Sequence, residues 1–403
     1  MGGGARGRLR ATAAAACCAL ALAGAGAGAA ERGRWSVEAT PNPPGPLDSE
    51  LFGVSCPSAS ACLAVGYATG GAAEALLAER FDGVRWRLAQ PAVPAGAVTA
   101  AFVGVSCAST AACTAVGNYR DRTGLTLTLA ERWDGSAWAI EPTPDPGRRY
   151  PHPTLDSGTE FSGVSCASAS ACVAVGDYLD RRHRSVALVE RWDGSRWSLE
   201  RTPDAVGRQL GGAFCPAASA CVAVGERHRG FGVLAPVAER STGPRWMLVA
   251  APAANVPGSM TSILVSVSCS SARSCAAVGD RSTAAGAHAP FVERLSGSAW
   301  SIEATPPRAD AALGGVSCGS AGDCTAVGLD AGSNRGRTLP LVERWNGRSW
   351  SLEAGAALGR DRTAGALAAV SCPSPTVCVA VGFATYDAGG VVRTLTLAER
   401  RGG

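Results

Sequence analysis

Seven cysteine pairs with one fixed spacing run through the chain, and in each pair the second cysteine lies six residues after the first. Each second cysteine is followed by one residue and then by Ala-Val-Gly. The first cysteines of successive pairs are 49 to 59 residues apart. A period of this length is typical of repeat architectures, so it constrains the fold before any other feature does. The pairs are Cys56 with Cys62, Cys107 with Cys113, Cys166 with Cys172, Cys215 with Cys221, Cys269 with Cys275, Cys318 with Cys324 and Cys372 with Cys378.

The paired cysteines are expected to be disulfide-bonded. The pairs hold 14 of the 16 cysteines, and an even count at one repeated spacing predicts seven disulfides in an oxidising compartment. Each disulfide would close a short loop between two antiparallel strands. Zinc is the alternative, but zinc sites usually space their ligands about two to four residues apart and combine two such pairs. The chain has only four His, so we expect no metal site.

The first thirty residues differ from the rest of the chain. Arg6, Arg8 and Arg10 precede an apolar stretch, and small residues follow as far as Ala30. This order predicts a secretory signal peptide over residues 1–30 and an extracellular protein, either free or associated with the cell wall. A lipid-modified cysteine at Cys17 or Cys18 is the alternative. No later segment is apolar for long enough to predict a membrane-spanning helix.

The charge balance argues against a nucleic-acid partner. The chain has 37 basic residues, all of them Arg, and 33 acidic residues, which gives a net charge of +4. Loss of residues 1–30 would remove three Arg and no acid, and so would leave a net charge of +1. Such a chain lacks the broad basic surface that binds nucleic acid.

Each repeat contains four short patches that read as β-strands. They resemble Phe52 to Cys56, Cys113 to Gly117, Leu188 to Arg191 and Trp197 to Glu200, and Gly, Pro or Asp separates them. Asp-Gly or Asn-Gly stands between the third and fourth patches in several repeats and favours a hairpin turn. Glu-Arg ends the third patch of every repeat, and the fourth patch carries a Trp, so we expect both to be structural.

Four antiparallel strands in a repeat of about 50 residues are typical of a β-propeller blade. The seventh repeat ends at Arg400 without its fourth strand, whereas an equivalent segment, Trp35 to Pro41, stands near the N-terminus. We therefore expect an all-β, seven-bladed propeller that occupies residues 31–403 as one domain. The N-terminal strand completes the last blade and so removes open sheet edges.

In blade layout the chain resembles secreted bacterial β-propeller repeat proteins, and it is broadly similar to kelch-type and sialidase-like propellers. The turns such as Asp134 to Trp138 resemble the Asp-box of sialidase-like blades but are one residue shorter between Asp and Trp, and the WD40 signature is absent. The resemblance implies a propeller and assigns no particular activity.

The loops that vary between repeats are the expected binding surface, because a rigid scaffold presents function on its loops. Basic and aromatic residues gather in the loops after the second strands of blades two to four and in the connection that enters blade three. Arg binds carboxylate, sulfate or phosphate, and Tyr can stack on sugar rings. The candidate residues are Tyr119, Arg120, Arg122, Arg148, Arg149, Tyr150, His152, Tyr178, Arg181, Arg182, His183, Arg184, Arg227 and Arg229, with His228 among them.

A second pattern follows the Ala-Val-Gly of the repeats. The next residue is Asn118, Asp177, Glu226 and Asp280 in four successive blades. These residues are either loop-capping side chains or part of a calcium or carboxylate site. The other blades carry Tyr67, Leu329 and Phe383 there, so no complete ring of ligands exists.

The sequence favours a non-catalytic role and leaves enzymatic activity open. We expect a secreted, monomeric binding or scaffold propeller without a cofactor. The loops of blades two to four would recognise an anionic glycan or an acidic protein surface. The alternative is a carbohydrate-active enzyme, glycosidase or sialidase-like, that uses carboxylates on the same face. No catalytic residue is assigned, since no Ser-His-Asp order or phosphate-binding loop is discernible.

Overall fold

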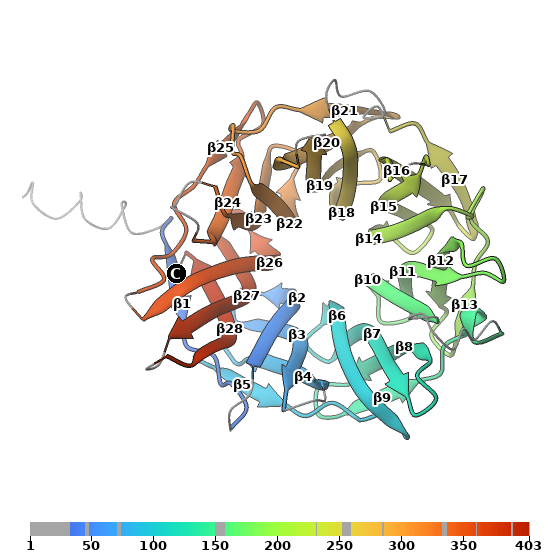
Figure 1. Cartoon of the computed structure of the whole chain (residues 1–403), viewed down its shortest axis with the longest axis horizontal. Helices are drawn as coiled ribbons and strands as arrows, with labels where there is room; N and C mark the ends of the chain where they lie inside the picture. The colour runs from blue at the N-terminus through green and yellow to red at the C-terminus, as the bar shows by residue number, and fades with distance from the viewer. Residues whose placement is uncertain are drawn as a thin grey trace, which may run out of the picture.

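The computed structural model describes residues 33–44, 48–70, 74–149, 158–230, 232–251, 259–283, 286–332, 337–359, 361–387 and 390–402. The predicted signal peptide over residues 1–30 lies outside these residues. The described chain is all-β apart from one turn of 3₁₀ helix, η1 (Pro146–Arg149). Antiparallel sheets form a ring around a central opening (Figure 1). No described helix has the length and apolar character needed to cross a membrane.

The first four repeats contribute sixteen strands. Repeat 1 has β2 (Asp48–Ser58), β3 (Ala61–Thr69), β4 (Glu74–Phe81) and β5 (Trp86–Ala89). Repeat 2 has β6 (Ala97–Ser109), β7 (Ala112–Asp121), β8 (Thr126–Trp133) and β9 (Trp138–Glu141). Repeat 3 has β10 (Thr159–Ser168), β11 (Ala171–Leu179), β12 (Ser185–Trp192) and β13 (Trp197–Leu199). Repeat 4 has β14 (Arg208–Ala217), β15 (Ala220–His228), β16 (Leu234–Thr242) and β17 (Arg245–Val249).

The last three repeats follow the same order. Repeat 5 has β18 (Ser259–Ser271), β19 (Ser274–Thr283), β20 (His288–Ser296) and β21 (Ala299–Glu303). Repeat 6 has β22 (Ala311–Ser320), β23 (Asp323–Asp330), β24 (Leu339–Trp345) and β25 (Trp350–Leu352). Repeat 7 has β26 (Arg362–Ser374), β27 (Val377–Asp387) and β28 (Val392–Arg401), and its outer strand is β1 (Trp35–Glu38).

The predicted division into seven separate four-stranded blades is wrong. The structure has five separate four-stranded blades, which are those of repeats 1, 2, 3, 6 and 7, whereas β14 to β21 form a single eight-stranded sheet. Leu234 of β16 pairs in parallel with Thr261 of β18 and so joins repeats 4 and 5. The 13-residue strand β18 extends far enough to reach the start of β16. A repeat pattern in a sequence cannot show such a pairing, because it is a backbone contact between repeats.

The predicted closure of the ring by the N-terminal strand is confirmed. β1 pairs antiparallel with β28, with Trp35 opposite Arg401 and Glu38 opposite Ala398. The hairpin turns also form as expected. Gly83, at +95°, and Gly135, at +100°, have the positive φ that such turns require.

The seven predicted disulfides are confirmed, and each one lies within its own repeat. The Cα atoms of each bonded pair are 3.9–4.0 Å apart, across the hairpin between the first and second strands. The bonds join Cys56 to Cys62, Cys107 to Cys113, Cys166 to Cys172, Cys215 to Cys221, Cys269 to Cys275, Cys318 to Cys324 and Cys372 to Cys378.

These disulfides close the short loops as expected, and their cysteines also contribute to the core. The second cysteine of every pair is a core residue that is 1–3% exposed, and each one belongs to a different hydrophobic cluster. The sulfur atoms of these residues therefore pack mainly between sheets. The residues concerned are Cys62, Cys113, Cys172, Cys221, Cys275, Cys324 and Cys378.

Hydrophobic clusters lie between neighbouring sheets. One cluster joins Leu63 and Val65 of β3 to Phe102 of β6 and Trp138 of β9. The Trp near the start of each outer strand is buried, as expected for a packing residue. These clusters hold each sheet against the next one around the ring.

The innermost strands approach one another at backbone distance. A Cβ added to Gly53 of β2 would lie 2.9 Å from the Cα of Gly104 in β6, the innermost strand of the next repeat. A Cβ added to Gly315 would lie 2.9 Å from the Cα of Ala369. Glycine is therefore required at both positions, because a larger side chain would push the strands apart.

A ring of hydrogen bonds also connects the innermost strands. The residue before the first cysteine is Ser in six repeats, and its Oγ accepts the backbone N–H of the first cysteine in the next repeat at 2.9–3.0 Å. Repeat 4 has Phe214 at this position, so the corresponding bond to Cys269 is missing among the described contacts. This missing hydrogen bond falls between repeats 4 and 5, where the pairing of Leu234 with Thr261 joins the sheets instead.

The repeated Glu-Arg pair occupies structural positions, and in several repeats one of its members contacts a neighbouring segment. All seven Glu side chains are fully buried. Glu131 accepts a hydrogen bond from the backbone N–H of Ala92, in the segment that enters its repeat, at 3.0 Å. In repeats 3, 5, 6 and 7 the Arg crosses to the following repeat, where Arg191, for example, donates to the carbonyl oxygen of Ala218 at 2.9 Å.

Burial of these carboxyl groups makes stability depend on pH. Burial, aided by the charge of Asp145, raises the pKa of Glu190 to about 9. The folded protein therefore keeps this proton at pH values where the unfolded chain has lost it. Stability from this group is complete below the ordinary pKa of 4.5 and falls as the pH rises toward about 9.

We expect Glu190→Gln to reduce this pH dependence. Between pH 5 and pH 8 the free energy of unfolding should fall less steeply than in the unmodified protein, by up to about 1.4 kcal/mol per pH unit. Denaturant titrations at both pH values measure the slope. Glu74→Gln, at an exposed position, is the control, and an unchanged slope in the Glu190 variant would contradict the prediction.

Ser165→Ala should destabilise the ring. Its hydroxyl accepts the N–H of Cys215 at 2.9 Å in buried surroundings, so the variant leaves a buried donor unpaired at a cost of about 1–3 kcal/mol. Ser198→Ala is the matched control, because Ser198 is exposed and its bond to the carbonyl of Arg191 is long, at 3.4 Å. Chemical denaturation measures both variants, and an equal loss in the two would refute the role of the serine ring.

Candidate functional site

The two ends of the ring differ in chemistry. The cysteine loops and the hairpin turns between the third and fourth strands lie together at one end, where the N–H of Gly243 bonds to the carbonyl of Ser219 at 2.8 Å. The loops after the second strands and the connections between repeats lie at the other end. There, the N–H of His228 bonds to the carbonyl of Gly207 at 2.8 Å. We call the second end the variable face and the first the disulfide face.

The candidate residues of repeat 2 lie at the end of β7 and in the turn after it. Tyr119 is half-buried, and burial raises its pKa. Arg120 is exposed and donates from Nε to the carbonyl of Gly124 at 3.0 Å, so it stabilises its own turn. Asp121 accepts bonds from the N–H and hydroxyl of Thr123 at 2.8 and 2.6 Å. Arg122 projects from this ordered turn and is exposed.

The connection into repeat 3 brings a further cation to Tyr119. Arg148, in η1, is exposed. Its positive charge opposes the burial that raises the pKa values of Tyr119 and Asp145, and it adds to the Thr123 hydrogen bonds that lower the pKa of Asp121. Arg148 therefore lies within electrostatic reach of Tyr119. Tyr150, His152 and the side chain of Arg149 lie outside the described residues.

The turn after β11 displays four basic side chains. Arg181, Arg182, His183 and Arg184 are all exposed, and Tyr178 before them is half-buried. Asp180 accepts two bonds from Arg184, at 2.9 and 2.7 Å, and this hydrogen bonding lowers the pKa of Asp180 to about 2. Arg184 is thus largely neutralised by its own turn.

Repeat 4 contributes a cluster of guanidinium groups. Arg227 of β15 is half-buried and pairs across the sheet with Arg208 of β14. Burial, together with the charges of Arg229 and Arg208, lowers the pKa of Arg227. Arg208 is bonded to Glu239, at 3.4 Å, whereas Arg227 Nε has no hydrogen-bond acceptor within the described chain. Arg229 and His228 are exposed beside it.

Asn118, Asp177, Glu226 and Asp280, the residues that follow Ala-Val-Gly in repeats 2 to 5, form what we call the acidic arc. Most of them make contacts within the fold. Asn118 exchanges two hydrogen bonds with the backbone of Phe161, at 3.1 and 2.8 Å, and so ties β7 to the next innermost strand. Asp177 accepts bonds from Ser185 at 2.7 Å and from Gln209 at 3.3 Å. Asp280 pairs with His288 at 2.8 Å.

Glu226 is the remaining carboxylate of the arc. Burial raises its pKa, and the nearby charges of Asp177 and Asp280 add to this effect. Across the described residues, no group of three or more His, Cys, Asp or Glu side chains has the geometry to hold a metal ion.

A central channel of about 250 Å³ passes between the innermost strands. Gly, Val and Ser residues line it, for example Gly53, Val105 and Ser165. None of the described residues that line the channel is charged.

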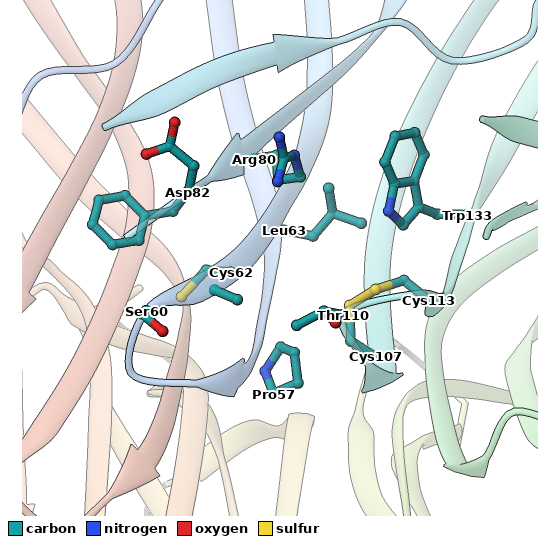
Figure 2. A pocket seen from close by; sticks show the side chains of 12 residues that line it. Pro57, Ser60, Cys62, Leu63, Arg80, Asp82, Cys107, Thr110, Cys113 and Trp133 are labelled. Carbon is teal, nitrogen blue, oxygen red and sulfur yellow. A yellow bond between two sulfur atoms is a disulfide. The ribbon is translucent and has the colours of Figure 1, made fainter. Parts of the chain in front are cut away.

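A pocket between repeats 1 and 2 was not predicted from the sequence. It has a volume of about 120 Å³ and lies near the disulfide face, with Arg80 on one side and Trp133 on the other (Figure 2). Leu63, Pro57 and the Cys107–Cys113 disulfide line it between them. No signal in the sequence marks it, because Arg80 belongs to the Glu-Arg pair that every repeat contains.

The comparisons with known proteins concern the fold alone. No protein-family model matches the chain, and no curated protein matches it. A structure of YCF48 bound to D1 peptide is 10% identical, with a TM-score of 0.53 over 92% of this chain and 95% of that chain. YCF48 from Cyanidioschyzon merolae is 11% identical, with a TM-score of 0.50 over 92% and 98% of the two chains.

A GH74 xyloglucanase from Xanthomonas campestris is also similar in structure. It is 13% identical, with a TM-score of 0.54 over 90% of this chain and 55% of that chain. At such identities the similarity shows that the chain has the β-propeller fold that was expected.

We expect Arg80→Gln and Arg294→Gln to differ in their effect on stability. The guanidinium of Arg294 lies 4.0 Å from the ring centre of Trp345, so its loss should cost about 1 kcal/mol. Arg80 has no ion pair, side-chain hydrogen bond or ring contact within the described chain, so its loss should stay within about 0.5 kcal/mol. Thermal and chemical denaturation measure the loss of stability in each variant. An equal loss in the two would contradict the conclusion that Arg294 stacks on Trp345 whereas Arg80 makes no such contact.

Proposed function

We propose that the protein is a non-catalytic binding propeller whose variable face holds an anionic ligand, either an acidic glycan or an acidic protein segment. One observation carries the proposal. The side chains of Arg122, Arg182 and Arg229 are exposed, and none of them makes an ion pair with any part of the chain that the structure describes. They project from the same end of three consecutive repeats.

The neighbouring contacts prepare these arginines for binding. The turns that carry Arg122 and Arg182 are ordered by Asp121 and Asp180, which accept backbone hydrogen bonds at 2.8 Å in both cases. Ordered turns lower the entropy lost when a ligand binds. Tyr119 and Tyr178 are half-buried beside the arginines and each packs against a hydrophobic cluster, so only the exposed part of each ring is open to a sugar or a peptide side chain.

A polypeptide ligand has additional support. One propeller of similar fold is described as bound to a peptide. Arg side chains bind carboxylates with two parallel hydrogen bonds, which suits Asp and Glu side chains as well as uronic acids. The same face therefore serves either anionic polymer, and a binding experiment distinguishes them.

We also propose that the protein works outside the cell. Seven disulfides in one chain are typical of oxidising compartments and rare in the reducing cytosol. The expected signal peptide over residues 1–30 agrees with this location.

A glycosidase is the second candidate function. The supporting observation is that burial raises the pKa of Glu226, as a general acid requires, with Asp177 and Asp280 close enough to contribute. Against it, Asp177 and Asp280 are already engaged by Ser185 and His288. The binding function therefore accounts for more of the arrangement.

The test measures binding of polyglutamate and polygalacturonate to the oxidised protein at low and physiological salt. We expect salt-sensitive binding of one polymer, and replacement of Arg122, Arg182 and Arg229 together by Gln should weaken it about tenfold or more. Replacement of Arg85, Arg196 and Arg348 by Gln is the charge-matched control, because these exposed residues lie in hairpin turns at the disulfide face.

An equal loss in both triple variants would show that net charge alone governs binding and would refute the site. Absence of binding by both polymers would refute the proposed function. Release of new reducing ends from polygalacturonate, abolished by Glu226→Gln, would instead establish the glycosidase.

A further inference from the structure

The Arg of the Glu-Arg pair stacks on an aromatic ring of the following repeat at three interfaces. Arg132 lies 4.6 Å from the ring centre of Trp192, and Arg294 lies 4.0 Å from that of Trp345. Arg400 of repeat 7 lies 5.1 Å from the ring centre of Phe81 in repeat 1. The aromatic residue in each case ends the third strand of its repeat.

The interface between repeats 1 and 2 has the same two partners without the contact. Arg80 is the Arg of the pair, and Trp133 is the aromatic residue in the corresponding position. No stacking joins them in the described structure, and the pocket of about 120 Å³ lies between them instead (Figure 2). A cation and an aromatic face are thus both present, and the space that separates them is open.

The walls of the pocket are mainly apolar. Leu63, Pro57 and the Cys107–Cys113 disulfide form them, and Trp133 is half-buried. The volume is close to the roughly 150 Å³ of an apolar cavity that accepts benzene. A single six-membered ring therefore suits the space by size and by polarity.

Among the described residues that line the pocket, Asp82 is the only carboxylate, and other groups compensate its charge. Asp82 pairs with Arg87 at 2.6 Å and accepts the backbone N–H groups of Val84 and Arg85 at 3.0 and 2.9 Å. These bonds lower the pKa of the Asp82 carboxyl group and compensate its negative charge. Among the charged groups of the described pocket lining, the guanidinium of Arg80 is the one without a partner in the described chain.

A wider groove of about 450 Å³ adjoins the pocket and shares Arg80 and Trp133 with it. Gln90 and Ser136 add polar side chains to this groove. Substituents of a ring bound in the pocket can therefore extend into polar surroundings.

We propose that this pocket binds an aromatic ring that bears a carboxylate, with the ring against Trp133 and the carboxylate on the guanidinium of Arg80. The site lies toward the disulfide face and is independent of the variable face. Two sources share this chemistry: a free aromatic acid and an aromatic residue at the carboxyl terminus of a polypeptide.

The experiment uses calorimetry and ligand-observed NMR with 3-phenylpropionate on the oxidised full-length protein. 3-Phenylpropan-1-ol supplies the ring without the charge, and butyrate supplies the charge without the ring. We expect the acid to bind about tenfold more tightly than either control, because a charge-assisted hydrogen bond is added to the ring contact. Equal affinity of the acid and the alcohol would overturn the proposal.

Arg80→Gln should remove the preference for the acid, whereas Arg294→Gln, at an interface where the guanidinium already stacks on Trp345, should leave it unchanged. Binding of the acid that survives Arg80→Gln would overturn the proposal, and so would the absence of saturable binding by the acid.

Ac-Ala-Ala-Phe with a free carboxylate, compared with its amide, identifies the source of the ligand. Tighter binding of the peptide acid than of 3-phenylpropionate, lost in the amide, indicates a polypeptide terminus. Exclusion of the peptide indicates a free aromatic acid.

Discussion

The close approach of the innermost strands is the constraint on which the rest of the structure depends. At Gly53 and Gly315 the neighbouring backbone leaves no space for a Cβ, and serine hydroxyls bond to the adjacent backbone in six of the repeats. These contacts bring the sheets together around a narrow channel. The outer strands then splay apart, and the space between them is filled by Trp, by buried Glu and by Arg that crosses to the next repeat. Where that filling is incomplete, as between repeats 1 and 2, a pocket remains.

The sequence predicted the parts of the fold that are local or repeated. Cysteines six residues apart can only meet across a tight turn, and Asp-Gly determines the hairpin by its backbone preference. The closure by Trp35 to Glu38 was predictable because one repeat lacked a strand that the N-terminus supplied. The division into sheets was not predictable. The pairing of Leu234 with Thr261 is a backbone contact between repeats, and Phe214 is one apolar residue in a serine column whose role becomes visible only in the assembled ring.

The candidate sites show a similar limit. The arginines of the variable face were evident as departures from a repeated pattern, and the structure places Arg148 near Tyr119 and Arg227 near Arg229. The acidic arc was ambiguous from sequence, because a carboxylate that caps a strand and one that binds a ligand have the same spacing. Contacts of Asn118 with Phe161, and of Asp280 with His288, favour internal roles. The pocket beside Arg80 has no sequence signal at all, since it arises from the absence of a contact that other repeats make.

The seven disulfides and the closure of the ring operate over very different lengths of chain. Each disulfide spans six residues and can form as soon as its own repeat has been made. β1, in contrast, can pair only once β28 has been made, since Ser36 pairs with Arg400 at the other end of the chain. Complete oxidation is therefore no measure of a finished fold, and a fully oxidised chain can still be an open ring with an unpaired edge. Two such open chains could exchange their first strands, so a quality check based on free thiols would accept entwined dimers together with closed monomers.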